Sequence, residues 1–157
     1  MRPRFPSGIH LAKASEIDAI FEIEQRCFPG NISYSKRQLE YLILDANSDC
    51  LVEKQDGTIR AFLIVTYRQG SSTCHIETVD VDPVFKNQGI GLKLLEAAEI
   101  DMRRRGMRYS KLEVSDGNEA ALRLYRKAGY TSKEKIENYY TFEHNGTRNA
   151  IRMIKAL

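Results

Sequence analysis

Two glycines one residue apart, Gly89 and Gly91, lie between a strand-like segment that ends at Pro83 and an amphipathic segment. At a strand-to-helix junction, glycines let backbone N–H groups point into one space, where these donors and the helix dipole attract an anion such as phosphate. The same glycines could serve only to permit a tight turn. The pair therefore predicts a phosphate-binding loop only if other residues of the chain support it.

The two common phosphate-binding loops do not fit this segment. The dinucleotide-binding pattern G-x-G-x-x-G needs a third glycine where this chain has Leu94. The Gly-Lys-Ser/Thr of the nucleotide-hydrolysing P-loop is also missing. Neither a dinucleotide site nor a nucleotide-hydrolysing site is predicted here.

The segment KNQGIG, Lys86 to Gly91, resembles the Gln/Arg-x-x-Gly-x-Gly/Ala loop with which the Gcn5-related N-acetyltransferase (GNAT) family holds the pyrophosphate of acetyl-CoA. A second segment, LEVSDGNEAALRLYRKAGY, is similar to another motif of that family, and the resemblance extends from about Ile9 to the C-terminus. Lys86 departs from the usual Gln or Arg; it keeps a donor but loses the planar side chain. The resemblance implies an α/β fold of the GNAT type, with a mixed central β-sheet flanked by about four helices, and acetyl-CoA as the acetyl donor.

The resemblance also implies which residues contact the cofactor. They are Val79, Asp80 and Val81 of the strand before the loop, Lys86, Asn87, Gln88, Gly89, Ile90, Gly91 and Leu92 of the loop itself, and Asn118 and Tyr125 further along the chain. By its pattern Asn118 is a helix N-cap, and this role can coexist with a hydrogen bond to CoA. The side chains of Val79 and Val81 are typical of a core.

Acetyl transfer from a thioester to an amine needs a neutral amine and an acid for the departing thiolate. The resemblance assigns the base to Glu113 and the acid to Tyr125, whereas their spacing alone is more typical of a strand glutamate in a salt bridge and of a core tyrosine. On the strand before the loop, Glu77 and His75 alternate with Ile76 and Thr78, which are predicted to share the opposite face. Glu77 and His75 could instead hold a water for deprotonation or be exposed strand polars. The base therefore remains open between Glu113 and Glu77.

The segments CFPGNIS and NYY are similar to those of the RimI-type and Ard1-type branch, which acetylates the α-amino groups of protein N-termini. The implied substrate contacts are Phe28, Pro29, Gly30, Tyr139 and Tyr140. Ard1-type enzymes often carry a glutamate where this chain has Gly30. Because that carboxylate is missing here, Glu113 and Glu77 become more important as candidates for the base. The expected partners are protein or peptide N-termini, with the ribosome or a nascent chain as a further partner to consider.

Two other classes of function remain open at this point. An acetyltransferase acting on lysine side chains or on a small amine such as a polyamine would share the CoA residues and differ in the acceptor slot, against which NYY argues weakly. A non-catalytic CoA-binding or RNA-binding domain would follow if Glu113 and Tyr125 were purely structural.

Helices and strands alternate along the chain in the order that such a site needs. Helices are predicted after Ser15 as N-cap through Phe28, after Ser35 to about Asp45, from Gly91 to Gly106 and from Asn118 to Gly129. Strands are predicted in the apolar segment from Ile9, at residues 50–55 and 59–68 around the turn Asp56-Gly57, from residue 74 to the stop at Pro83, at 109–115, and as two strands around the turn Asn145-Gly146.

Length and composition predict one globular domain, residues 8–157, after an N-terminal extension of residues 1–7. Hydrophobic residues make up 42% and charged residues 29%, which argues against a disordered, collagenous or membrane-spanning chain, and the net charge of +3 gives nucleic-acid binding little support. The cysteines, Cys27, Cys50 and Cys74, are widely spaced and are predicted to be buried thiols, with no metal site. No stretch approaches the roughly 20 apolar residues of a membrane span, and no apolar segment follows the basic start, so a cytoplasmic protein is expected.

Overall fold

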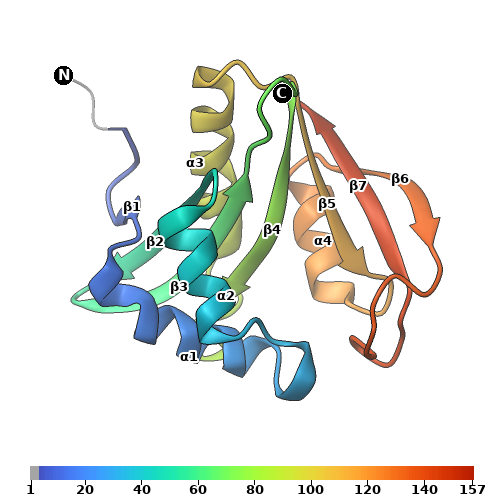
Figure 1. The fold of residues 1–157 in the computed structure, drawn as a ribbon, viewed down its shortest axis with the longest axis horizontal. Coiled ribbons are helices and arrows are strands. Elements are labelled where there is room, and N and C mark those ends of the chain that lie inside the picture. The colour runs from blue at the N-terminus through green and yellow to red at the C-terminus, as the bar shows by residue number, and fades with distance from the viewer. Residues whose placement is uncertain (1–3) are drawn as a thin grey trace.

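The computed structural model describes residues 4–157, which form one seven-stranded sheet with helices on both faces (Figure 1). The strands are β1 (Ile9–Leu11), β2 (Ser48–Gln55), β3 (Thr58–Thr66), β4 (Thr73–Val81), β5 (Tyr109–Ser115), β6 (Thr131–Ile136) and β7 (Ala150–Ala156). The helices are α1 (Ile17–Cys27), α2 (Lys36–Glu40), which continues into a π-helical turn (Tyr41–Asp45), α3 (Ile90–Arg104) and α4 (Glu119–Lys127). Short 3-10 turns lie at Ala14–Glu16, Gly30–Ile32 and Pro83–Phe85. The predicted mixed sheet with four flanking helices is confirmed.

The sheet order is β1-β2-β3-β4-β5-β7-β6, in which β4 and β5 run parallel and the other neighbouring pairs are antiparallel. The parallel pairing covers only Thr73–His75 against Tyr109–Lys111. Past His75 the two strands separate, as Figure 1 shows, so within residues 4–157 the β5-facing edge of β4 has no strand partner there. The main-chain groups on this edge are free to bind something other than a strand.

Two apolar clusters hold the helices on the sheet. The larger contains buried side chains of α3 and α4, among them Leu94, Met102 and Leu122, and the smaller contains those of α1 and α2, such as Ile20 and Leu39. The amphipathic segment after the glycine pair is confirmed as α3, since its apolar stripe of Leu94, Leu95, Ala98 and Met102 is at most 1% exposed. The separated strands therefore lie between two rigidly packed layers.

A β-bulge in β4 changes which side chains share a face. Ile64 of β3 lies opposite Thr78 and Val65 lies opposite Ile76, so Glu77 is the extra residue. As a result Ile76 packs in the α3–α4 cluster, while Thr78 faces the α1 side. The expectation that Ile76 and Thr78 share a face, opposite His75 and Glu77, was therefore wrong. Strict strand alternation does not hold across a bulge.

Two helix and turn assignments also need correction. Ser15 does not cap α1; it lies inside a 3-10 turn in which the carboxylate of Glu16 accepts the N–H of Lys13 at 2.9 Å, and α1 begins at Ile17. The turn at Asn145-Gly146 is present, with a bridge between His144 and Thr147, but it lies inside a longer loop rather than closing a tight hairpin between β6 and β7. The cap at Ser35 is confirmed: its hydroxyl accepts the N–H of Gln38 at 3.1 Å.

The part of the predicted N-terminal extension that the structure describes contacts the rest of the chain. Arg4 donates two hydrogen bonds to Asp101, at 3.0 and 2.7 Å, and one to Asp49 at 3.1 Å. Cys50 and Cys74 are buried free thiols as predicted, and Cys27 is half-buried. Across residues 4–157, none of the helices has the length and apolar character that crossing a membrane requires.

Candidate active site

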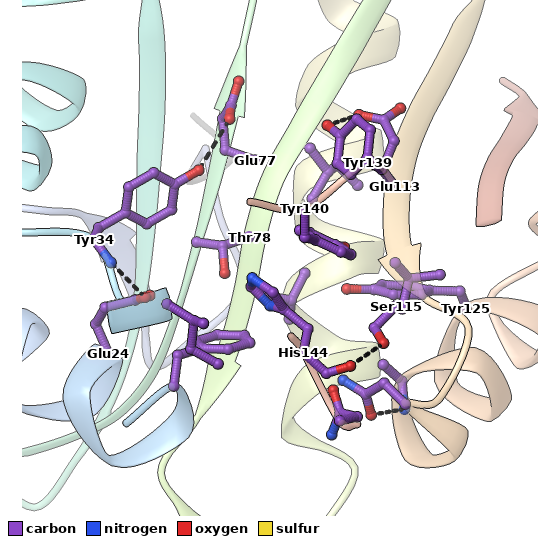
Figure 2. A pocket seen from close by; sticks show the side chains of 18 of the residues that line it. Glu24, Tyr34, Glu77, Thr78, Glu113, Ser115, Tyr125, Tyr139, Tyr140 and His144 are labelled. Atoms are coloured by element: carbon purple, nitrogen blue, oxygen red, sulfur yellow. Dashed lines mark hydrogen bonds between the residues drawn. The ribbon is translucent and has the colours of Figure 1, made fainter. Parts of the chain in front are cut away.

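A cavity of about 290 Å³ opens where β4 and β5 separate (Figure 2). Its walls come from α1 and the segment after it, from β4, β5 and α4, and from the loop between β6 and β7. Of the residues predicted from the sequence, the cavity is lined by Phe28, His75, Glu77, Val79, Glu113, Asn118, Tyr125, Tyr139 and Tyr140. The structure thus brings both base candidates, the proposed acid and the aromatic pair to one place.

His75 lies between the two candidate bases. Its Nδ1 is 2.9 Å from Glu77 Oε1 and its Nε2 is 2.7 Å from Glu113 Oε1. Both ring nitrogens can donate only in the protonated imidazolium. Burial acts to lower the pKa of His75, but the hydrogen bonds and charges of Glu113 and Glu77 outweigh burial and raise the pKa to about 9.

Glu113 is held as an ion. Besides His75, it accepts the hydroxyl of Tyr139 at 3.2 Å and Nε of Arg152 at 3.2 Å. Burial acts to raise its pKa, but His75 and then Arg152 and Tyr139 outweigh this effect, and the pKa falls to about 2. By itself such a carboxylate is a weak base, so proton removal must involve the hydrogen-bonded group of which it is part.

Glu77 has the same character. The pKa of Glu77 is lowered chiefly by its hydrogen bond to His75, and the carboxylate also accepts the hydroxyls of Tyr34 at 3.2 Å and Thr66 at 3.1 Å. The two carboxylates and the imidazolium together carry a net charge of −1, and Arg152, which also contacts Glu113, is balanced by Glu134. This net negative charge attracts an ammonium group.

We predict that His75 stays protonated at neutral pH and titrates near pH 9, which proton NMR of its ring can measure. Because this pKa lies above the unfolded value of about 6.5, the pairing stabilises the fold below that pH and is lost as pH rises through about 9. His144, whose pKa is lowered by burial, is the internal control. A His75 titration at or below that of His144 would contradict the pairing.

Tyr125 presents its hydroxyl to the same cavity from α4 (Figure 2). The residue is 7% exposed, and burial raises the pKa of its phenol. The hydroxyl therefore remains protonated at neutral pH and is available to donate to an anion that forms beside it. The core packing that the helical pattern predicted and the placement at the cavity are both present.

The glycine loop has the geometry that a phosphate needs. Gly89 adopts a left-handed φ of 77°, and α3 begins at Ile90, so its first-turn N–H groups have no partners within the helix. Gly91 is buried, and a Cβ there would lie 3.0 Å from Leu124 of α4 and 3.6 Å from Val81. A fifteen-residue helix with a free N-terminus and a close approach to α4 fits a pyrophosphate.

The remaining predicted cofactor residues lie around the same opening. Val79 and Val81 pack on the α3–α4 cluster, which leaves their main chain on the free edge of β4. Asn118 caps α4 by accepting the N–H of Ala121 at 3.2 Å, as predicted, and it also lines the cavity. Asp80 differs, because its side chain is 1% exposed and points away from the loop toward α1. Only its main chain is placed to meet a cofactor.

The side of the cavity formed by the loop between β6 and β7 is aromatic. Tyr140 stacks on His144 with ring centres 3.9 Å apart, and Tyr139 packs edge-on against Tyr140 at 4.9 Å. Ser115 donates to the carbonyl of His144 at 2.7 Å and so holds this loop against β5. Pro29 and Gly30 are not among the lining residues, whereas the neighbouring Phe28 is.

Sequence reasoning missed several lining residues, including Glu24, Tyr34, Thr78 and His144. Tyr34 directly follows the segment CFPGNIS, and this position was the signal that could have identified it. Thr78 faces the cavity only because of the bulge at Glu77, which the sequence pattern does not reveal. A second, shallower hollow of about 390 Å³ lies on the other side of the hydrogen-bonded pair of Tyr34 and Glu77. Residues of α2 and of the π-helical turn, such as Gln38 and Tyr41, line it. The two hollows share Tyr34 and Glu77.

A sheet whose parallel strands part beside a glycine loop is the architecture of the acetyltransferase (GNAT) family, and the profile of that family matches residues 17–130. The chain belongs to this family and is an acetyl-CoA-dependent N-acetyltransferase. It is 30% identical over 149 residues to the [ribosomal protein bS18]-alanine N-acetyltransferase of Escherichia coli strain K12, covering 92% of this chain and 94% of that one. The crystal structure of the ribosomal-protein-S18-alanine N-acetyltransferase from Escherichia coli superposes with a TM-score of 0.83 at 26% identity, covering 94% and 92% of the two chains. Ard1 from Thermoplasma volcanium shares the fold, with a TM-score of 0.79 at 22% identity and coverage of 95% and 96%.

Proposed function

We propose that this protein acetylates the free α-amino group of protein N-termini with acetyl-CoA. The observation that carries the proposal is the imidazole of His75, held between two carboxylates in the same cavity as the hydroxyl of Tyr125. The similarity to a bS18-alanine N-acetyltransferase over most of both chains supports an N-terminal amine as the acceptor.

The loop at residues 86–92 would hold the pyrophosphate of CoA with its backbone N–H groups, and the free edge of β4 at Val79–Val81 would bind the pantetheine. The side-chain oxygen of Asn118 caps α4, so its amide NH₂ would be free to donate to the pantetheine. This arrangement would bring the thioester into the cavity beside Tyr125.

The acceptor would enter as an ammonium drawn to the net negative cluster of His75, Glu77 and Glu113. A second cation beside the imidazolium disfavours both protonated forms, so the ammonium releases one proton to water and the neutral amine forms. As the amine nitrogen bonds to the acetyl carbon and the C–S bond breaks, the cluster takes the second amine proton, and Tyr125 gives its proton to the departing thiolate. The base is thus the hydrogen-bonded group rather than Glu113 alone.

An α-amine suits this site better than a lysine side chain. Its pKa lies near 8 against about 10.4 for lysine, so delivering it neutral at pH 7 requires roughly 3 kcal/mol less. The aromatic side chains of Tyr139, Tyr140 and His144 would enclose the first residue of the acceptor peptide. The following residues of the peptide would leave past Tyr34 toward the second hollow. A ribosomal protein or nascent chain is the acceptor to test first.

We predict that peptides with a free N-terminus are acetylated on the α-amine at least about 100-fold faster than internal lysines of the same peptides with a blocked N-terminus at neutral pH. Mass spectrometry locates the acetyl group, and thiol release measures the rate, with polyamine and no-acceptor reactions as controls. Equal or preferential acetylation of lysine or polyamine would replace the N-terminal assignment with the corresponding amine class.

A further inference from the structure

Two carboxyl groups are buried against each other beside the acceptor cavity. Glu24 of α1 and Asp80 of β4 are each 1% exposed. Each carboxyl acts on the pKa of the other, and one oxygen of each, Glu24 Oε1 and Asp80 Oδ2, is buried with no fixed donor to satisfy it. Two ionised carboxylates have no donor between them, so one of the two must carry a proton.

The other contacts of the pair indicate where that proton lies. Glu24 Oε2 accepts the backbone N–H of Tyr34 at 3.0 Å, which favours the ionised form of Glu24. Asp80 Oδ1 accepts the hydroxyl of Thr78. The oxygens left over, Glu24 Oε1 and Asp80 Oδ2, are buried and accept from no fixed donor, so a single proton shared by the two carboxyl groups satisfies both.

Within residues 4–157, no cation acts on Asp80 to compensate a second negative charge. The titratable groups that face it are Glu24 and Cys27 of α1, Tyr34, Cys50 of β2 and Tyr125 of α4. Burial raises the pKa of each of these thiols and phenols, so they are neutral. The positive charge of Lys86 acts to lower the pKa of the Cys27 thiol. It makes no such contribution to the pKa of Asp80.

The pair supports two walls of the cavity. Glu24, Tyr34 and Thr78 all line it. Tyr34 is fixed at both ends, since Glu24 accepts its backbone N–H and its hydroxyl donates to Glu77 at 3.2 Å. Figure 2 shows this connection from Glu24 through Tyr34 to Glu77.

We propose that Asp80 is a positioning residue for acetyl transfer: the proton it shares with Glu24 fixes Tyr34, which in turn orients Glu77 toward the acceptor amine. The inference rests on the function proposed above. Loss of the shared proton leaves two buried anions in contact, and their separation releases Tyr34. The acceptor KM therefore rises as pH passes through the pKa of Asp80, while CoA binding on the opposite side of β4 is unaffected.

Asp80→Asn separates this role from a purely structural one. The asparagine oxygen still accepts from Thr78, and its NH₂ donates to Glu24 without a proton that can be lost. The ratio of wild-type to Asp80→Asn acceptor KM is expected to rise about tenfold or more over the pH range in which Asp80 loses its proton, which the infrared band described below locates, with little change in the kcat ratio. Glu99→Gln changes another buried carboxyl, which pairs with Lys155 away from the cavity. This variant should show the same pH dependence of the acceptor KM as the wild type. A KM ratio that is constant with pH would overturn the proposal.

Two measurements test the shared proton without any acceptor. Infrared spectra at neutral pH should contain a protonated-carboxyl band in the wild type that Asp80→Asn lacks. The pKa of Asp80 is raised by burial above its unfolded value near 4, so the free energy of unfolding falls as pH rises above that value; the Tm advantage of Asp80→Asn should grow in step. Absence of the band refutes the pair. If no peptide is acetylated, the proposed function fails, and these two results still decide the state of Asp80.

Discussion

Glu113→Gln is expected to slow acetyl transfer by about 10²–10⁴-fold while acetyl-CoA affinity stays nearly unchanged. The substitution removes the anion that His75 binds at 2.7 Å and that Tyr139 and Arg152 also contact. The deficit should shrink as pH rises, because the α-amine loses its proton without help above a pKa near 8. Steady-state kinetics across pH with a free N-terminal peptide measures both effects.

The control variants distinguish the base from its neighbours. Glu134→Gln removes the other carboxylate that Arg152 contacts, at 2.5 Å, outside the cavity, and should leave the rate unchanged. Tyr125→Phe should also slow transfer, but high pH should not rescue it, because the missing group is an acid. A pH-independent loss at Glu113 together with a pH-rescued loss at Glu77→Gln would move the base assignment to Glu77.

Gly89→Val is expected to weaken CoA binding by about 10–100-fold, since holding a β-branched residue in the left-handed region costs about 1–3 kcal/mol. No atom lies within 4 Å of a Cβ at Gly89, so the effect comes from backbone conformation alone. Calorimetry gives the affinity, and the rise in Tm at saturating acetyl-CoA gives an independent measure.

The glycine series contains its own controls. Gly57 has a φ of 79° and the same open surroundings at a distant turn, so Gly57→Val adds the same strain without touching the loop. Gly89→Asn should retain most of the affinity, because asparagine tolerates the left-handed region. Gly91→Val should also weaken CoA binding, but for a different reason: a Cβ at this position lies 3.0 Å from Leu124. Unchanged CoA affinity in Gly89→Val would remove the loop from the cofactor site.

Local sequence patterns determined most of the fold. The alternation of apolar residues, the caps at Ser35 and Asn118 and the turn at Asp56-Gly57 each act over a few residues, and the structure contains all of them. The error at Ser15 arose because the carboxylate of Glu16 competes for the same capping position. Glu16 is only 6% exposed and also binds His10, and this burial could not be read from the local pattern.

The sequence by itself determined the chemistry that is available: a glycine loop before a helix, a strand glutamate, a helix tyrosine and an aromatic pair near the C-terminus, each set by neighbours in the chain. Only the tertiary structure decided how these groups act on one another. The bulge at Glu77 and the parting of β4 from β5 place His75 between carboxylates from two strands, and the packing of α1 on β4 brings Glu24 against Asp80. These are contacts between residues far apart in sequence, and the resulting pKa values depend on burial and on charges supplied by other elements, which no local pattern contains.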